Sequence, residues 1–382
     1  MLRKTLFWLH LCCGIAVGLV VFTMAFTGAA LMYERQVQQW AARQDYLPVQ
    51  AQTTRLPLET LIALQHGQYP EMPVTALTIT NDPGAPVEFR AGRRSVSLNP
   101  YDGTPMTVGS PALSAFFSTM TGVHRWLNLE GEHRALARQI TGVSNVTFLF
   151  LVLSGLYLWL PKLWKWALLK VRLCLRGAYP SSKARDFHWH HIAGIWMALP
   201  LLAVIASGAV ISYPWAANLM YWVFGAEIPQ QAIGGSGSGT GEQRAAHFDG
   251  NGVAIAGMPL DTLLQNALAH SGAGWNRVNL SLPQPGATVV RIEIDKGNGA
   301  QAQRRHTLVL ARESGAVIQV NGYADTPKAQ RLRSIARFLH TGEVLGFWGQ
   351  TLAGVASFAA VLLVWTGLAL SWRRLISAWR SG

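Results

Sequence analysis

The stretch FWLHLCCGIAVGLVVFTMAFTGAALMY, residues 7–33, decides how the rest of the sequence is interpreted. It is mostly apolar and carries no charged side chain, and its length of about 25 residues is what an α-helix needs to cross a bilayer. Arg3 and Lys4 precede it, as in a signal peptide, but the apolar run is too long for one. We therefore predict a retained membrane helix.

The same pattern returns at residues 187–213, FHWHHIAGIWMALPLLAVIASGAVISY. At a shift of 180 positions the matched pairs are His10 with His190, Gly14 with Gly194, Gly28 with Gly208 and Tyr33 with Tyr213. A shift of 212 matches Gly142 with Gly354 and Gly155 with Gly367. Such internal repeats favour an architecture with a pseudo-twofold axis.

The composition indicates a membrane protein with sizeable polar parts. Half of the residues are hydrophobic and only 13% are charged, whereas soluble domains have about a quarter charged. The basic excess lies largely beside the apolar spans, where it sets topology, so no nucleic-acid partner is expected. Basic residues dominate the loop at 163–187 and both termini, which predicts that these lie in the cytoplasm of a bacterial inner membrane.

The predicted fold class is an α-helical membrane protein with four transmembrane helices, an internal two-fold repeat and two small periplasmic α+β domains. Its expected order is helix 1 (1–33), domain 1 (34–135), helix 2 (136–162), a basic cytoplasmic loop (163–187), helix 3 (188–214), domain 2 (215–340), helix 4 (341–374) and a cytoplasmic tail (375–382). Each domain pairs an amphipathic helix, LPLETLIAL (56–64) or MPLDTLLQNAL (258–268), with alternating strand patterns. The stretch GGSGSGTG (234–241) is expected to be a flexible loop.

Four of the eleven histidines have counterparts across the repeat, and they fall at the two faces of the membrane. His10 and His190 lie at the cytoplasmic ends of helices 1 and 3, and His124 and His340 precede helices 2 and 4. Two imidazoles from two helices can take both axial positions of a haem iron, and b-type haem needs no CxxCH attachment motif. None is present, so the expected cofactor is haem b, two per chain.

The ligand assignment leaves alternatives open. In the run HWHH, His188, His190 and His191 compete, and His133 competes with His124. Gly14 and Gly194, one turn after the histidines, would let a flat porphyrin approach the backbone. The tryptophans that would pack against such rings are Trp159, Trp196, Trp348 and Trp365.

An ordered set of motifs resembles the PepSY-associated transmembrane family of iron-regulated bacterial membrane proteins. It comprises WLHLCCG with Thr27-Gly28, VHRWL (123–127), SGLYLWLPK (154–162), FHWHHIAG with Ser207-Gly208, FLHTGEVLG (338–346) and TGLALSW (366–372). The resemblance covers nearly the whole chain. It implies PepSY-like polar domains and, because the chain is compact, similarity to ferrisiderophore reductases of the inner membrane.

The resemblance also implies partners. A ferric siderophore of the hydroxamate type would be reduced in the periplasm, releasing Fe(II), with electrons from membrane quinol or a cytoplasmic reductase. The expected haem-iron ligands are His10, His190, His124 and His340. Candidate substrate contacts are Arg90, Arg93, Arg94, Arg304, Arg305, Tyr101, Trp275 and Tyr323. The competing hypotheses are a siderophore permease or permease partner, and a PepSY-type binding or regulatory module.

Overall fold

The computed structural model describes residues 1–48, 54–161, 165–229, 257–283 and 286–380. These residues form two compact units. A helical unit contains Met1–Glu34, Ala112–Ala232 and Leu332–Gly382, and a sheet unit contains Arg35–Pro111 and Ile233–Arg331. The glycine- and serine-rich stretch at 234–241 lies outside the described residues.

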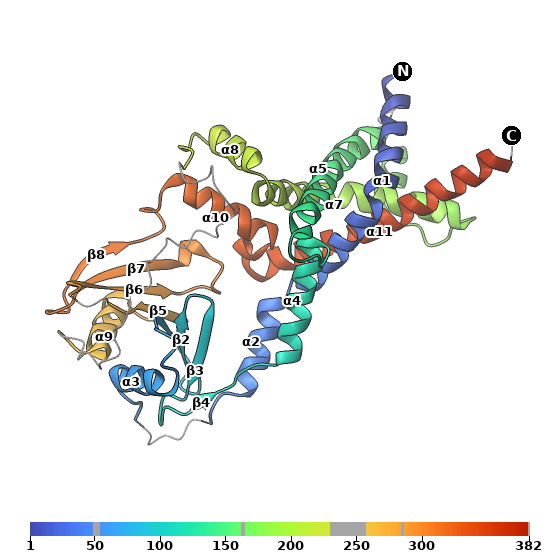
Figure 1. Cartoon of the computed structure of the whole chain (residues 1–382). Helices are drawn as coiled ribbons and strands as arrows, with labels where there is room; N and C mark the ends of the chain where they lie inside the picture. The colour runs from blue at the N-terminus through green and yellow to red at the C-terminus, as the bar shows by residue number, and fades with distance from the viewer. Residues whose placement is uncertain (49–53, 162–164, 230–256, 284–285, 381–382) are drawn as a thin grey trace. The chain divides into compact units, whose positions relative to one another are not determined.

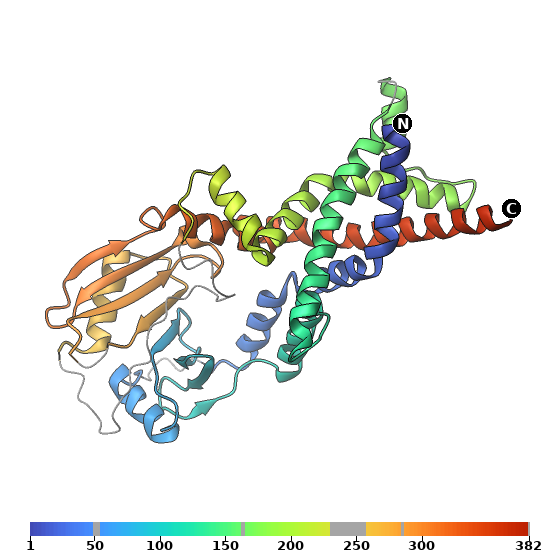
Figure 2. The same ribbon diagram turned by 45° about the horizontal axis from the view of Figure 1, so that its top comes forward.

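Four long helices make the helical unit: α1 (Leu2–Leu31), α5 (His133–Trp159), α7 (Ser182–Ser212) and α11 (Gly346–Arg380). Each is long and apolar enough to cross a membrane. They pack in the cyclic order α1, α5, α7, α11, so that α1 lies diagonally across from α7 (Figure 1). The start of α1 and the end of α11 lie at the same end of this bundle (Figure 2).

Small side chains close the middle of the bundle. Ala356 and Ala360 of α11 are completely buried against Leu201 and Ile205 of α7. Alanine at such positions lets two helix backbones approach closely, which is how membrane helices gain packing energy without a hydrophobic driving force. The bundle is therefore tightly packed between its two ends.

The helical unit also contains shorter helices: α4 (Pro111–Trp126), α6 (Trp166–Leu173), α8 (Pro214–Val223) and α10 (Lys328–His340). The end of α4 is sharply defined. Leu127 and Asn128 both adopt positive φ values, 51° and 59°, and the Asn128 amide donates to the carbonyl of Gly122 at 3.1 Å. Consecutive left-handed residues other than glycine are strained, and such strain is concentrated at functional sites.

The sheet unit holds the helices α2 (Glu34–Gln44), α3 (Leu58–Gln68) and α9 (Leu260–Ser271) and eight strands. The strands are β1 (Ala76–Thr80), β2 (Val87–Ala91), β3 (Arg94–Leu98), β4 (Pro105–Met106), β5 (Arg277–Ser281), β6 (Val289–Asp295), β7 (Arg305–Ala311) and β8 (Val317–Asn321). They form one antiparallel sheet in the order β4-β3-β2-β1-β5-β6-β7-β8.

The junction of this sheet differs from the expected pair of separate small domains. Strand β1 from the first half of the chain pairs along its whole length with β5 from the second, with Thr78 opposite Asn279. One face of the junction strands is apolar, and on it Leu77 and Leu280 are fully buried. The two repeats thus share one core instead of enclosing two.

Helices α3 and α9 cap one another. The Leu260 amide donates to Glu59 Oε1 at 2.5 Å, and the Leu58 amide donates to Asp261 Oδ2 at 2.8 Å. Each carboxylate thereby satisfies an amide at the start of the other helix, where backbone donors lack partners within their own helix. The matching PLET and PLDT sequences produce this exchange.

Candidate functional site

Two pairs of histidines lie at the two ends of the helix bundle. We call His10 of α1 and His190 of α7 the terminal-end pair, because they lie toward the end that carries both chain termini. His124, in the last turn of α4, and His340, the last residue of α10, form the opposite-end pair. The sequence therefore predicted which histidines share a level of the bundle.

Each of these histidines contacts a Ser-Gly or Thr-Gly dipeptide on a neighbouring long helix. Hydrogen bonds of 2.8–3.4 Å join each Nδ1 atom to the hydroxyl of the dipeptide. The four combinations are His10 with Ser154-Gly155, His124 with Thr27-Gly28, His190 with Thr366-Gly367 and His340 with Ser207-Gly208. The same contact between a histidine and a hydroxyl-glycine dipeptide thus occurs at each of the four histidines.

The hydroxyl groups can only accept hydrogen bonds from the histidines, because each hydroxyl donates its own proton to a backbone carbonyl. Ser154 Oγ donates to the Phe150 carbonyl at 2.7 Å, and Thr366 Oγ1 donates to the Leu362 carbonyl at 2.7 Å. Thr27 and Ser207 likewise bond the carbonyls one turn earlier. A hydroxyl carries a single donor. The proton between each pair therefore belongs to the histidine Nδ1 atom.

Backbone carbonyls fix the same tautomer at the opposite end. His124 Nδ1 lies 2.9 Å from the Met24 carbonyl, and His340 Nδ1 lies 2.8 Å from the Val204 carbonyl. A carbonyl only accepts, so Nδ1 is the protonated nitrogen. Among the described residues no hydrogen bond reaches Nε2 of any of the four histidines, which leaves an Nε2 lone pair on each ring. This is the arrangement found in metal-ligating histidines, whose other nitrogen is held by an outer partner.

The glycines of the dipeptides bring the rings against helix backbone. A Cβ atom added at Gly208 would lie 3.1 Å from His340 Cε1, and one at Gly28 would lie 3.2 Å from His124 Cε1. At Gly155 and Gly367 the corresponding distances to His10 and His190 are 3.4 and 3.3 Å. Even a methyl group would press on the rings, so glycine sets their position.

The two rings of the opposite-end pair lie at a spacing that fits a shared metal. The centroids of His124 and His340 are 6.2 Å apart and their planes differ by 55°. An imidazole nitrogen binds a metal at about 2 Å and lies about 1 Å from its ring centre, so two axial rings have centres about 6 Å apart. His10 and His190, from diagonal helices, lie within electrostatic range of one another.

Both rings of the opposite-end pair are neutral at pH 7. Burial lowers the pKa of His124 to about 4, with a further contribution from His340, and burial also lowers the pKa of His340. Only a neutral imidazole has the lone pair that a metal needs.

The other candidate histidines have different surroundings. Both nitrogens of His188 are engaged, Nδ1 with the Tyr179 hydroxyl at 2.9 Å and Nε2 with the Val171 carbonyl at 3.0 Å. His191 bonds the Phe187 carbonyl and lies against the Phe187 ring at 4.1 Å. His133 is exposed at the start of α5. The geometry therefore favours His190 and His124 over these alternatives.

Three of the tryptophans expected to pack against the cofactors point outward instead. The exposed fractions of Trp196, Trp348 and Trp365 are 60%, 78% and 63%. On membrane-crossing helices such residues form an interfacial belt. Gly14 and Gly194 do not contact the histidines: an added Cβ meets no atom within 4 Å at Gly14 and only Leu363, at 3.7 Å, at Gly194.

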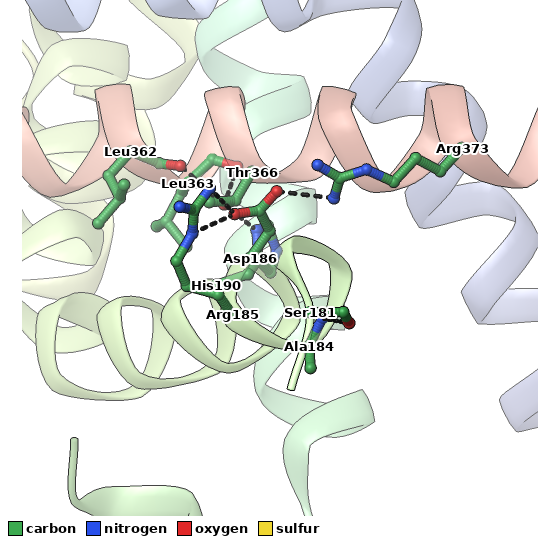
Figure 3. A network of polar contacts seen from close by, with 9 residues as sticks. All are labelled: Ser181, Ala184, Arg185, Asp186, His190, Leu362, Leu363, Thr366 and Arg373. Atoms are coloured by element: carbon green, nitrogen blue, oxygen red, sulfur yellow. Dashed lines mark hydrogen bonds and ion pairs between the residues drawn. The ribbon is translucent and has the colours of Figure 1, made fainter. Parts of the chain in front are cut away.

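A buried acid organises the terminal end (Figure 3). Asp186 lies one turn before His190, is 2% exposed, and accepts from Arg185 at 3.0 Å and from Arg373 of α11 at 2.7 Å. This bridge ties α7 to α11 at the level where Thr366 of α11 holds His190. Both oxygens of the carboxylate accept hydrogen bonds from guanidinium donors.

Several of the predicted substrate contacts in the sheet unit already interact with other residues of that unit. Arg305 forms ion pairs with Glu293 and Asp295, both at 3.6 Å, and Arg90 pairs with Glu88 at 3.4 Å. The Tyr101 hydroxyl donates to the Pro83 carbonyl, and Trp275 packs against the sheet core. Arg93, Arg94 and Arg304 are exposed, and Tyr323 lies under the Arg331 guanidinium.

The donor sets suit a metal that brings its own equatorial ligands. In the described part of the chain, no group of three or more His, Cys, Asp or Glu residues could hold a bare metal ion. Two imidazoles with free Nε2 atoms are a common donor set for the iron of a b-type haem. The residues present therefore fit haem: His10 and His190 would hold one group, and His124 and His340 would hold another.

Fold and site together define a four-helix membrane protein with a buried histidine pair at each end of its bundle. The chain belongs to the PepSY-associated TM region family, whose model matches residues 7–374. No curated protein matches the sequence. The family match confirms the resemblance drawn from the motifs at the level of the family.

Sequence reasoning missed the four hydroxyl residues that hold the histidines. Thr27, Ser154, Ser207 and Thr366 each precede a glycine, and this recurrence was visible in the sequence. A serine or threonine before glycine is common in membrane helices as a packing motif. Only the fold shows that each dipeptide meets a histidine.

Proposed function

We propose that this protein is a haem-containing oxidoreductase that moves electrons across the bacterial inner membrane to Fe(III)-siderophore in the periplasm. The observation that carries the proposal is the fourfold histidine arrangement, in which every Nδ1 atom is held and every Nε2 atom is left for a metal. Haem, when bound, supplies one-electron redox chemistry at two levels of the bundle.

The chain's own residues hold and isolate the two sites. The Ser-Gly and Thr-Gly dipeptides orient the rings, and the packed alanines between the levels exclude water. His10 and the dipeptide hydroxyl of Thr27 are seventeen residues apart on α1, as are His190 and Ser207 on α7. At 1.5 Å per residue this is about 25 Å along the axis, most of the hydrocarbon thickness.

The reduction itself releases iron by changing the ion. Siderophore oxygens are hard donors that hold Fe(III) firmly and Fe(II) weakly. Transfer of one electron converts chelated Fe(III) to Fe(II), which then leaves the intact siderophore. The electron comes from a separate donor, a membrane quinol or a cytoplasmic reductase. The finer resemblance, to the ferrisiderophore reductase FoxB, implies a hydroxamate siderophore as substrate.

The first test is the visible spectrum of the detergent-purified protein, oxidised and then reduced with dithionite, with a haem count per chain. We expect close to two haems. His124→Ala or His340→Ala should remove one, and His10→Ala or His190→Ala should remove the other. Matched controls are His188→Ala and His133→Ala, which should keep both.

Reoxidation of the reduced protein by a ferric siderophore then identifies the acceptor. A colourless protein, expressed with ample haem, would overturn the proposal and support a binding or transport role for the chain. Two haems without any siderophore-dependent reoxidation would retain the haem sites but reject this substrate.

A further inference from the structure

A group of arginines surrounds Trp126, two residues after His124. Arg125 lies with its guanidinium carbon 4.4 Å from the centre of the Trp126 ring, and Arg134 of α5 lies at 3.6 Å from the same ring. Arg138 follows one turn later on α5, and Arg337 precedes His340 by one turn on α10. We call these four the arginine cluster.

The contact with Trp126 leaves the N–H donors of the guanidinium groups available to bind a ligand. A guanidinium stacks through its flat face, whereas its five N–H donors point outward in its plane, where they match a carboxylate bidentately. Arg125, Arg134 and Arg337 are all exposed to solvent. The Arg138 side chain donates to the Ser212 carbonyl at 3.0 Å and fixes the base of the cluster.

The like charges are close enough to act on one another. The pKa of Arg125 is lowered by partial burial and then by the charges of Arg134, Arg138 and Arg337. Within the described ranges, no ion pair joins Arg125, Arg134 or Arg337 to a carboxylate. At the terminal end, by contrast, Arg185 and Arg373 both form ion pairs with Asp186. Uncompensated cations gathered beside a redox site indicate an anionic ligand.

The cluster is also absent from the other repeat. The positions matching Arg125 and Arg337 across α4 and α10 are Thr341 and Thr121. Across α5 and α11, Arg134 and Arg138 match Gly346 and Gln350. The histidines, hydroxyls and glycines are repeated, whereas these charges are not. The repeat relates residues at the same end of the bundle, so these charges make the opposite end asymmetric.

We propose that the arginine cluster binds a ligand that carries two or more carboxylates, held beside His124 and His340. Two sources have this chemistry: the propionate groups of a haem on this histidine pair, and the carboxylates of an anionic ferric chelate arriving as substrate. Both sources rest on the proposed function, the first on its haem and the second on its ferric substrate.

The first experiment measures binding of Ga(III)-citrate, a redox-inert polycarboxylate chelate, to the purified full-length protein by calorimetry. Arg125→Gln combined with Arg134→Gln should weaken binding by about tenfold or more, since each substitution removes charge-assisted hydrogen bonds to a carboxylate. Binding to the wild type should weaken as salt is raised. Arg134→Lys, which keeps the charge, should restore part of the affinity. This measurement needs no haem.

The second experiment measures retention of protohaem and of its dimethyl ester, which lacks the propionate charges. If the cluster binds propionates, the double variant should lose protohaem faster than wild type and hold the ester equally well. The matched control for both experiments is Arg333→Gln, which removes an exposed arginine one turn before Arg337 on the same helix.

Either loss, of Ga(III)-citrate binding or of protohaem retention, supports the carboxylate site and identifies its source. Unchanged values in both experiments overturn it. An equal effect from Arg333→Gln also overturns it, because the arginines would then act only as general surface charge. A change seen solely in binding to anionic phospholipid vesicles would identify a lipid contact and reject the proposal. A colourless wild-type protein would overturn the proposed function. The Ga(III)-citrate measurement would still test the carboxylate site, because it needs no haem.

Discussion

The two ends of the bundle hold their histidines in the same way but differ in charge. At both ends a hydroxyl and a glycine from a long helix fix each ring. At the terminal end Asp186 pairs with Arg185 and Arg373. At the opposite end, within the part of the chain that the structure describes, no ion pair joins Arg125, Arg134 or Arg337 to a carboxylate. The two ends thus share the way they hold the rings and differ in how their arginines are paired.

The rings also differ in how many acceptors hold them. His124, His340 and His190 each bond a backbone carbonyl in addition to a hydroxyl, whereas among the described residues His10 bonds Ser154 alone. His124 lies in the last turn of α4 and His340 ends α10, whereas His10 and His190 lie within membrane-crossing helices. His10 is therefore the ring with the fewest acceptors.

Replacing one histidine of each pair should separate the two ends most clearly. With His340→Ala we expect one haem that the electron donor still reduces but that ferric siderophore no longer reoxidises. With His190→Ala we expect the reverse, a haem that chelate reoxidises after chemical reduction but that the donor cannot reach. Stopped-flow spectra measure both half-reactions. Equal loss of both half-reactions in both variants would contradict a directional path.

The glycine contacts predict a smaller, local effect. Gly28→Ala should weaken haem binding at the opposite end by about tenfold, as typically follows when a partner of a metal ligand is disturbed, because the new methyl presses on His124. The control is Gly18→Ala on the same helix, where an added Cβ is also 3.2 Å from its neighbour but meets the flexible Leu368 side chain. Haem titration of both variants measures this. Similar losses in the two would mean that helix packing alone is responsible.

The membrane architecture could be predicted from the sequence because apolar runs of bilayer length are a strong and local signal. The histidine pairs could be predicted because the repeat placed them in matched positions. The shared sheet could not, since the pairing of β1 with β5 joins strands about two hundred residues apart. The sequence also could not predict that Trp196, Trp348 and Trp365 point outward. A tryptophan at the membrane interface and one that packs against a cofactor occur in the same local sequence pattern.

Removing single hydroxyls should show the difference in anchoring between His10 and His340. Ser154→Ala leaves His10 without its hydroxyl acceptor, so its ring and tautomer are no longer fixed. Ser207→Ala makes the same chemical change beside His340, where the Ser207 contact is long, 3.4 Å, and the Val204 carbonyl remains at 2.8 Å. We expect Ser154→Ala to weaken haem binding about tenfold and Ser207→Ala by less. Haem dissociation rates compare them; an equal or reversed order would refute unequal anchoring.

The smallest expected effect tests whether the two repeats depend on one another in the sheet unit as they do in the bundle. Glu59→Ala removes the acceptor of the Leu260 amide, and Asp261→Ala removes that of the Leu58 amide. Each should cost about 1 kcal/mol of stability, as loss of a helix cap does, and lower the Tm by a few degrees. Glu71→Ala, at an exposed acid, should leave the Tm unchanged.

Because Glu59 belongs to the first repeat and protects α9 of the second, hydrogen exchange should rise at Leu260 in Glu59→Ala and at Leu58 in Asp261→Ala. Exchange confined to the substituted helix would mean that each repeat folds independently, in spite of the shared β1–β5 pairing.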